Sequence, residues 1–105
     1  MKRQIVFRDL AVRDLDSQVA YIADHQDAET ARAYLAAASE TIAVIAAHPS
    51  IGRVNPYPSQ DLGQMRMIRV ARFISHLIFY RVELGAIEIV RVIHGARDLE
   101  NLFDE

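Results

Sequence analysis

The sequence predicts a single α+β domain, in which an N-terminal strand precedes two antiparallel helices that pack on a small antiparallel β-sheet. Two observations indicate this fold class. Apolar residues recur every three to four positions across 9–47, which is the period of an amphipathic helix, whereas the chain after residue 64 consists of short β-branched and aromatic runs. Because 105 residues have room for one core only, we expect one domain over 1–105.

The N-terminal segment combines a short strand with the first helix. Residues 3–8, RQIVFR, are rich in β-branched and aromatic side chains and fit a single strand. From Asp9 the apolar residues take on helical spacing, which predicts a helix over 9–25. The apolar stripe of this helix consists of Val12, Leu15, Val19 and Ile22.

A second helix is predicted over 28–47. Asp27 is a suitable N-cap, and no glycine or proline interrupts the helical period before Pro49. Since the link between the two helices is short, they should be antiparallel neighbours. The apolar positions of the second helix are Ala31, Tyr34, Leu35, Ala38, Ile42 and Ile45.

The second half of the chain begins with a long irregular connection and continues with three strands. Residues 48–64 hold all 3 prolines and two of the 4 glycines, so this segment should be a loop that could bind a partner. The runs 65–70, 73–82 and 86–93 are β-branched and aromatic and are separated by short breaks. They predict an antiparallel meander.

Neither of the two longer strands has a purely polar side. Strict alternation places Arg81 on the face of Leu77 and Phe79. The same rule places Arg91 on one face with three isoleucines, Ile87, Ile89 and Ile93. We therefore expect the helical hairpin to cover one face of the sheet, and the C-terminal tail or a partner to cover the other.

Charge is distributed unevenly along the chain. The formal net charge is only -2, yet residues 9–47 hold seven acidic residues against two arginines, whereas residues 65–97 hold six arginines against two glutamates. Arginine suits bidentate contacts with carboxylate or phosphate groups. The sheet half of the chain could therefore bind an anionic surface, although any single arginine also fits an ordinary solvated surface position.

Composition argues against several classes of protein. The chain has no cysteine, which indicates a reducing compartment, and its charged N-terminus resembles neither a signal peptide nor a membrane span, so a cytoplasmic protein is expected. His25, His48, His76 and His94 lack the spacing of a common metal site. No phosphate-binding loop, nucleophile elbow or dinucleotide motif is present, so we expect no metal and no cofactor.

Several motifs, taken together, resemble a known family. DLDSQVAYIAD, AHPSIGR, RMIRVARFISHLIFYRV and IEIVRVIHGARDL, in this order, are similar to the ParE branch of the RelE/ParE toxin superfamily. The most specific part is HLIFYRV followed by a short break, a hydrophobic strand and HGARDL. The resemblance implies a two-helix hairpin on a twisted antiparallel sheet, a neutralising antitoxin of the ParD type, and DNA gyrase as the usual target.

The sister RelE branch, which cleaves mRNA on the ribosome, provides the main alternative function. Comparison with that branch places Arg97 at the position of an arginine that follows the last strand, and Phe103 at the position of a tyrosine near the C-terminus. Ile68 and Val70 fall at the positions of two lysines. Phe103 has no hydroxyl for proton transfer, and the two aliphatic residues cannot stabilise phosphorane charge. The ribonuclease set therefore looks incomplete and no catalytic residue is assigned, although a shift of one residue would pair Arg69 or His76 with a lost basic position.

The resemblance and the basic sheet together suggest two sets of contact residues. Arg97 and Asp98 either close the last strand with a local ion pair or belong to a recognition element that contacts the target. A third possibility for the whole protein is an inactive member that only binds its antitoxin. Nucleic acid should be contacted only indirectly and the membrane not at all. The target-binding candidates are Arg69, His76, Arg81, Arg91, His94, Arg97, Asp98 and Phe103, and the antitoxin-binding candidates are Leu15, Val19, Ile22, Tyr34, Arg66 and Arg81.

Overall fold

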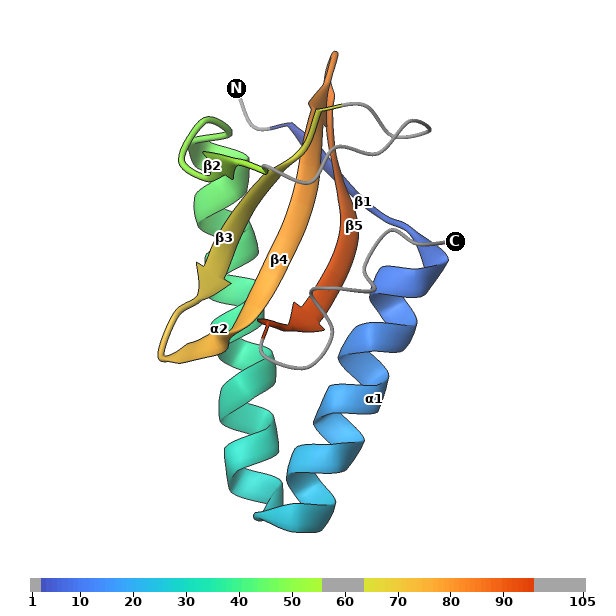
Figure 1. Ribbon diagram of the computed structural model, residues 1–105, viewed down its shortest axis with the longest axis vertical. Helices are drawn as coiled ribbons and strands as arrows, with labels where there is room; N and C mark the ends of the chain where they lie inside the picture. The colour runs from blue at the N-terminus through green and yellow to red at the C-terminus, as the bar shows by residue number, and fades with distance from the viewer. Residues whose placement is uncertain (1–2, 56–63, 96–105) are drawn as a thin grey trace.

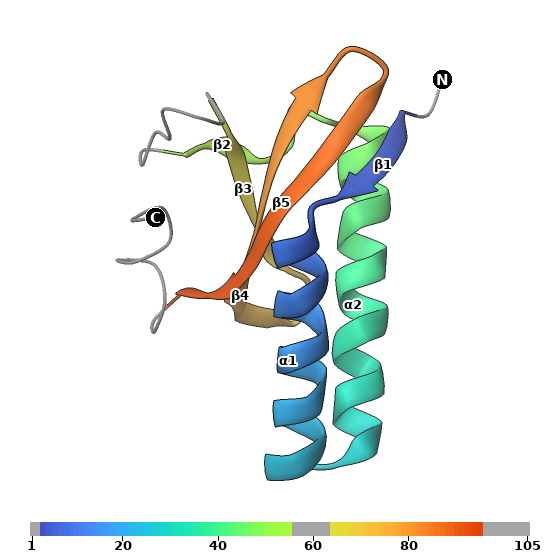
Figure 2. The same ribbon diagram turned by 90° about the vertical axis from the view of Figure 1, so that its right-hand side faces the viewer.

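The computed structural model describes residues 3–55 and 64–95 and has two helices beside a five-stranded sheet (Figure 1). Both helices lie on the same face of the sheet, as Figure 2 shows from the side. The elements are β1 (Gln4–Phe7), α1 (Asp9–His25), α2 (Ala28–Ala47), β2 (Arg53–Val54), β3 (Arg66–Val70), β4 (Phe73–Glu83) and β5 (Ala86–His94).

Both helices begin and end at the predicted residues. Asp27 caps α2 as expected, because its Oδ1 accepts a hydrogen bond of 2.6 Å from the backbone N–H of Thr30. This bond lowers the pKa of Asp27. Within the described part of the chain, neither helix is long and apolar enough to cross a membrane.

The sheet has the strand order β1-β5-β4-β3-β2 and is mixed. Strands β2 to β5 pair antiparallel, which confirms the predicted meander. β1 lies parallel to β5, with Ile5 opposite Ile87, because the helical hairpin carries the chain between the first strand and the rest of the sheet. The two-residue strand β2 falls inside the segment that was expected to be irregular.

A β-bulge in β5 overturns one predicted orientation. The pairing of β4 with β5 skips Val90, so the alternation of side chains shifts by one residue there. Ile87 and Ile89 consequently pack in the main core under the helices, whereas Ile93 belongs to a cluster on the opposite face. Arg91 shares the face of Ile93 only, and the prediction that it shares a face with all three isoleucines is wrong.

The main core fills the space between the helices and the sheet. Three alanines of α2, Ala31, Ala37 and Ala38, are buried there and allow α1 and α2 to approach closely. A second, smaller cluster of Leu77, Phe79 and Ile93 lies on the opposite face, with Met67 packed against it. Both faces of the sheet therefore carry apolar side chains.

Candidate functional site

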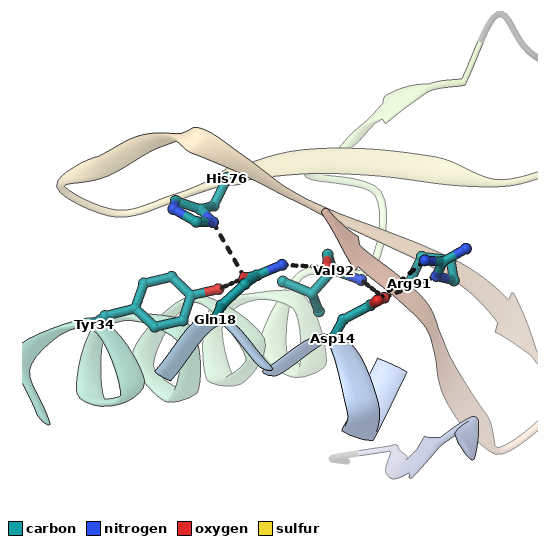
Figure 3. A network of polar contacts seen from close by, with 6 residues as sticks. All are labelled: Asp14, Gln18, Tyr34, His76, Arg91 and Val92. Carbon is teal, nitrogen blue, oxygen red and sulfur yellow. Dashed lines mark hydrogen bonds and ion pairs between the residues drawn. The ribbon is translucent and has the colours of Figure 1, made fainter. Parts of the chain in front are cut away.

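The edge of β5 changes partner along its length. β1 pairs with β5 only as far as Ile89, and beyond that point side chains of α1 take over (Figure 3). Asp14 Oδ2 accepts a bond of 2.9 Å from the backbone N–H of Val92, and Gln18 Nε2 donates one of 2.7 Å to the carbonyl oxygen of the same residue. The i, i+4 spacing of the two side chains lets them reach both backbone groups of a single edge residue.

Asp14 also anchors an arginine from the far side of β5. The two carboxylate oxygens of Asp14 lie 2.8 Å from Arg91 Nε and 3.0 Å from Arg91 Nη2, a bidentate geometry between two largely buried side chains. The guanidinium of Arg91 therefore reaches around the strand edge to α1. This ion pair joins the first helix to the last strand.

Gln18 is the centre of a buried polar network, shown in Figure 3. Because its Nε2 donates to Val92, its Oε1 faces inward, where it accepts a hydrogen bond from the Tyr34 hydroxyl. His76 Nδ1 lies 3.1 Å from the same oxygen and therefore carries the hydrogen. Burial, helped by the negative charge of Asp14, raises the pKa of Tyr34, so its hydroxyl stays protonated and remains a donor.

The two strand histidines lie together beside this network. His76 and His94 are register partners on β4 and β5, and their ring centroids are 5.2 Å apart. Nδ1 of His94 is buried and has no hydrogen-bond partner among the described residues. Both rings line a pocket of about 320 Å³ that also includes Ser17, Tyr21, Gln26 and Phe73. Since His76 contacts Gln18 of α1, the histidine pair lies on the helix-facing side of the sheet.

The arginines of the sheet half do not converge on one point. Arg69 donates to the carbonyl oxygen of Ile74 at 2.6 Å and lies on the face opposite the helices, next to Leu77 in the ladder. Arg81 binds Glu88 at 2.7 Å and also contacts Glu83. Arg66, by contrast, donates to carbonyl oxygens in the loop before β2. Each of these guanidinium groups therefore already has a structural contact.

Ile68 and Val70, the positions compared with two lysines of the RelE ribonucleases, lie on the helix-facing side of β3. Val70 is fully buried in the main core, and Ile68 packs against that core. A catalytic lysine must reach solvent, which the fully buried position of Val70 does not allow. The β3 side chains on the opposite face are Met67 and Arg69, which favours the alternative comparison shifted by one residue. That face of β3 then carries one basic residue, Arg69.

Tyr80 fastens the loop that leads into β2. Its hydroxyl donates to the carbonyl oxygen of Pro49 and accepts from the backbone N–H of Gly52, both at 2.8 Å. Burial raises the pKa of Tyr80, while the bond from Gly52 and the charge of Arg66 oppose the rise. A Cβ atom at position 52 would lie 2.6 Å from the hydroxyl oxygen, so only glycine fits there.

We expect Tyr80→Phe to lower the free energy of unfolding by roughly 2 kcal/mol, because it leaves the Gly52 N–H and the Pro49 carbonyl without a partner. Urea unfolding followed by circular dichroism measures this loss. Ser50→Ala is the matched control in the same loop, since only the backbone carbonyl of Ser50 is used. A Tyr80→Phe protein as stable as the Ser50→Ala protein would show that the hydroxyl does not hold the loop.

Comparison with known proteins gives the family. Residues 5–99 match the ParE toxin of type II toxin-antitoxin systems, parDE. The chain belongs to the ParE toxin family. A solved structure, the chromosomal ParDE toxin-antitoxin system from P. aeruginosa, shares its fold with a TM-score of 0.73, is 19% identical, and is matched over 89% of this chain and 96% of that chain. No curated protein sequence matches.

Four of the predicted antitoxin-binding residues belong to the main core of the ParE fold. Ile22 and Tyr34 are buried in the core, and Leu15 and Val19 are partly buried and pack against it. These four apolar side chains hold the helices on the sheet and form no exposed patch. Among the target-binding candidates, Arg97, Asp98 and Phe103 lie outside the described residues.

The sequence analysis missed the two polar residues that organise this ParE chain. No role was predicted for Asp14 or Gln18, yet their side chains close the edge of β5. A signal for them exists in the sequence. Both directly border residues of the apolar stripe, Leu15 and Val19, and their i, i+4 spacing puts them on one side of the helix.

Proposed function

We propose that this ParE-family toxin acts by binding DNA gyrase and stabilising its cleaved DNA complex, and that a ParD-like antitoxin neutralises it. The protein itself makes or breaks no bond in this mechanism. Support for the target comes from the family match over residues 5–99, because gyrase is the usual target that the resemblance implies. Both the target and the antitoxin are cytoplasmic, which gives the protein the same location.

One geometric observation carries the choice of binding over cleavage. RNA cleavage needs an acid–base pair and a phosphate-binding cation around the same phosphodiester. The two imidazoles, His76 and His94, lie on the helix-facing side of the sheet, whereas Arg69 lies on the opposite face. The imidazoles could transfer a proton and Arg69 could bind the phosphate. These groups lie on different sides of the sheet and cannot act on one phosphodiester.

The proposed antitoxin should combine apolar and acidic residues. The face opposite the helices has an apolar hollow, lined by Ile51, Met67 and Leu77, with two arginines at its margin, Arg53 and Arg69. A segment with apolar anchors and acidic flanks is complementary to such a surface. Binding must also raise the melting temperature of the toxin, because the antitoxin binds its folded state.

Inducing the protein alone in a bacterial host separates three functions. Gyrase poisoning predicts DNA damage and filamentous cells, mRNA cleavage predicts rapid loss of translation, and a member that only binds its antitoxin predicts normal growth. We expect filamentation that coexpression of the adjacent antitoxin gene abolishes. Loss of translation before any DNA damage would favour the ribonuclease.

In a purified system, we expect no codon-specific cleavage of mRNA on programmed ribosomes, even with the protein in excess. Primer extension on the ribosome-bound message measures the cut. Cleavage at substoichiometric protein would contradict the proposed function.

A further inference from the structure

β3 extends beyond the strand that covers its outer edge. β2 pairs with β3 only at Met67 and Arg66, and β3 continues to Val70 with no described strand along this outer edge. The backbone N–H of Asn55 bonds the carbonyl oxygen of Met65, so every second residue of β3 directs its backbone groups outward. The next outward position after Met67 is Arg69, whose N–H and C=O bond no described residue.

A hollow lies on each face of the sheet at this uncovered edge. One, of about 450 Å³, is lined by Ile51, Arg53, Met67 and Leu77, and the other, of about 150 Å³, is lined by Glu40, Thr41, Val44 and Ala71. Ile68 and Arg69 line both hollows, so the two meet at the strand edge. Consecutive side chains of an extended peptide point to opposite faces. A peptide paired with Arg69 would therefore place neighbouring residues in the two hollows.

We infer that the edge of β3 at Arg69 binds an extended segment of the antitoxin, a conclusion that rests on the proposed function. The larger hollow takes a large apolar residue, and the adjacent residue of the segment is small and apolar, because the second hollow is a third of the volume. An acidic residue two positions from the large one lies on the same face, near Arg53. The guanidinium group of Arg53 forms no hydrogen bond or ion pair with a described residue.

Amide hydrogen exchange tests the backbone contact directly. We expect the Arg69 amide to exchange at least about tenfold more slowly when the full chain is bound to the antitoxin encoded beside its gene. The Phe7 amide is the control, since it lies on the outer edge of β1 at the other end of the sheet, and it should not change. Formation of the complex without protection at Arg69 would overturn the inference and leave the proposed antitoxin in place.

Two α2 variants test the smaller hollow. Val44 lines it and is exposed, so Val44→Glu places a charge there with little effect on the core, whereas Leu35→Glu changes an equally exposed apolar residue elsewhere on α2. We expect Val44→Glu to weaken antitoxin binding by about tenfold or more in calorimetry and Leu35→Glu to leave it unchanged. Equal affinities would contradict the inference. Absence of any complex with the wild-type protein would contradict both the proposed antitoxin and this binding site.

Discussion

Replacing Gln18 with alanine should lower the free energy of unfolding by about 3 to 5 kcal/mol, the largest stability effect that we expect from one polar residue. The amide of Gln18 serves three groups at once: the Val92 carbonyl, the Tyr34 hydroxyl and His76 Nδ1. Each buried polar group that loses its partner costs roughly 1 to 3 kcal/mol. Water can enter from the adjacent pocket and offset part of that cost.

Chemical denaturation measures this effect, and two further variants isolate its cause. Ser17→Ala, at the neighbouring exposed position, should change stability by less than about 0.5 kcal/mol. Tyr34→Phe should be destabilising in the wild-type protein but close to neutral in the Gln18→Ala protein, because the hydroxyl has already lost its acceptor. Additive effects of the two changes would show that the hydroxyl and the amide do not act as one network.

Replacing Arg97 with alanine should abolish toxicity while the fold and antitoxin binding persist. In our proposal the HGARDL segment and the tail after it contact gyrase, and loss of a partly desolvated charged contact can cost about 2 to 5 kcal/mol. The recognition role requires Arg97 to be accessible to gyrase, and removal of an accessible charged side chain costs little core stability. The alternative reading, in which Arg97 and Asp98 only close the last strand, predicts that any loss of toxicity follows the loss of stability.

Growth inhibition, antitoxin affinity and thermal melting on the same variant separate these two readings. Arg13→Ala is a matched control, because Arg13 is an exposed arginine on α1 with no described partner. We expect the control to remain fully toxic. A fully toxic Arg97→Ala protein would exclude the recognition role, and a nontoxic variant that is also unfolded would favour the structural one.

The secondary structure follows closely from the sequence, because its signals are local. The apolar period and the Asp27 cap define both helices to the residue, and β-branched runs locate the four longer strands within one or two residues. The two-residue strand β2 could not be found among prolines and glycines. The bulge at Val90 was also hidden, since Ile87, Ile89, Val90, Val92 and Ile93 are all apolar and either alternation therefore looks acceptable.

The site follows from the sequence much less well, because its contacts join distant parts of the chain. Asp14 and Gln18 meet Val92 across more than 70 residues, and local patterns carry no information on that pairing. For the same reason, the sequence could not show whether Arg66, Arg69 and Arg81 converge on one face. Their backbone register directs them to different faces and different acceptors.

The most direct test of the central claim, that this ParE toxin binds gyrase rather than cutting RNA, is a DNA cleavage assay with purified gyrase, supercoiled plasmid and ATP. We predict that the toxin makes linear plasmid accumulate after detergent and protease treatment, and that equimolar antitoxin prevents it. Omission of gyrase should leave the plasmid intact. Unchanged supercoiling and no linear DNA at a toxin concentration that stops growth would contradict the proposed function.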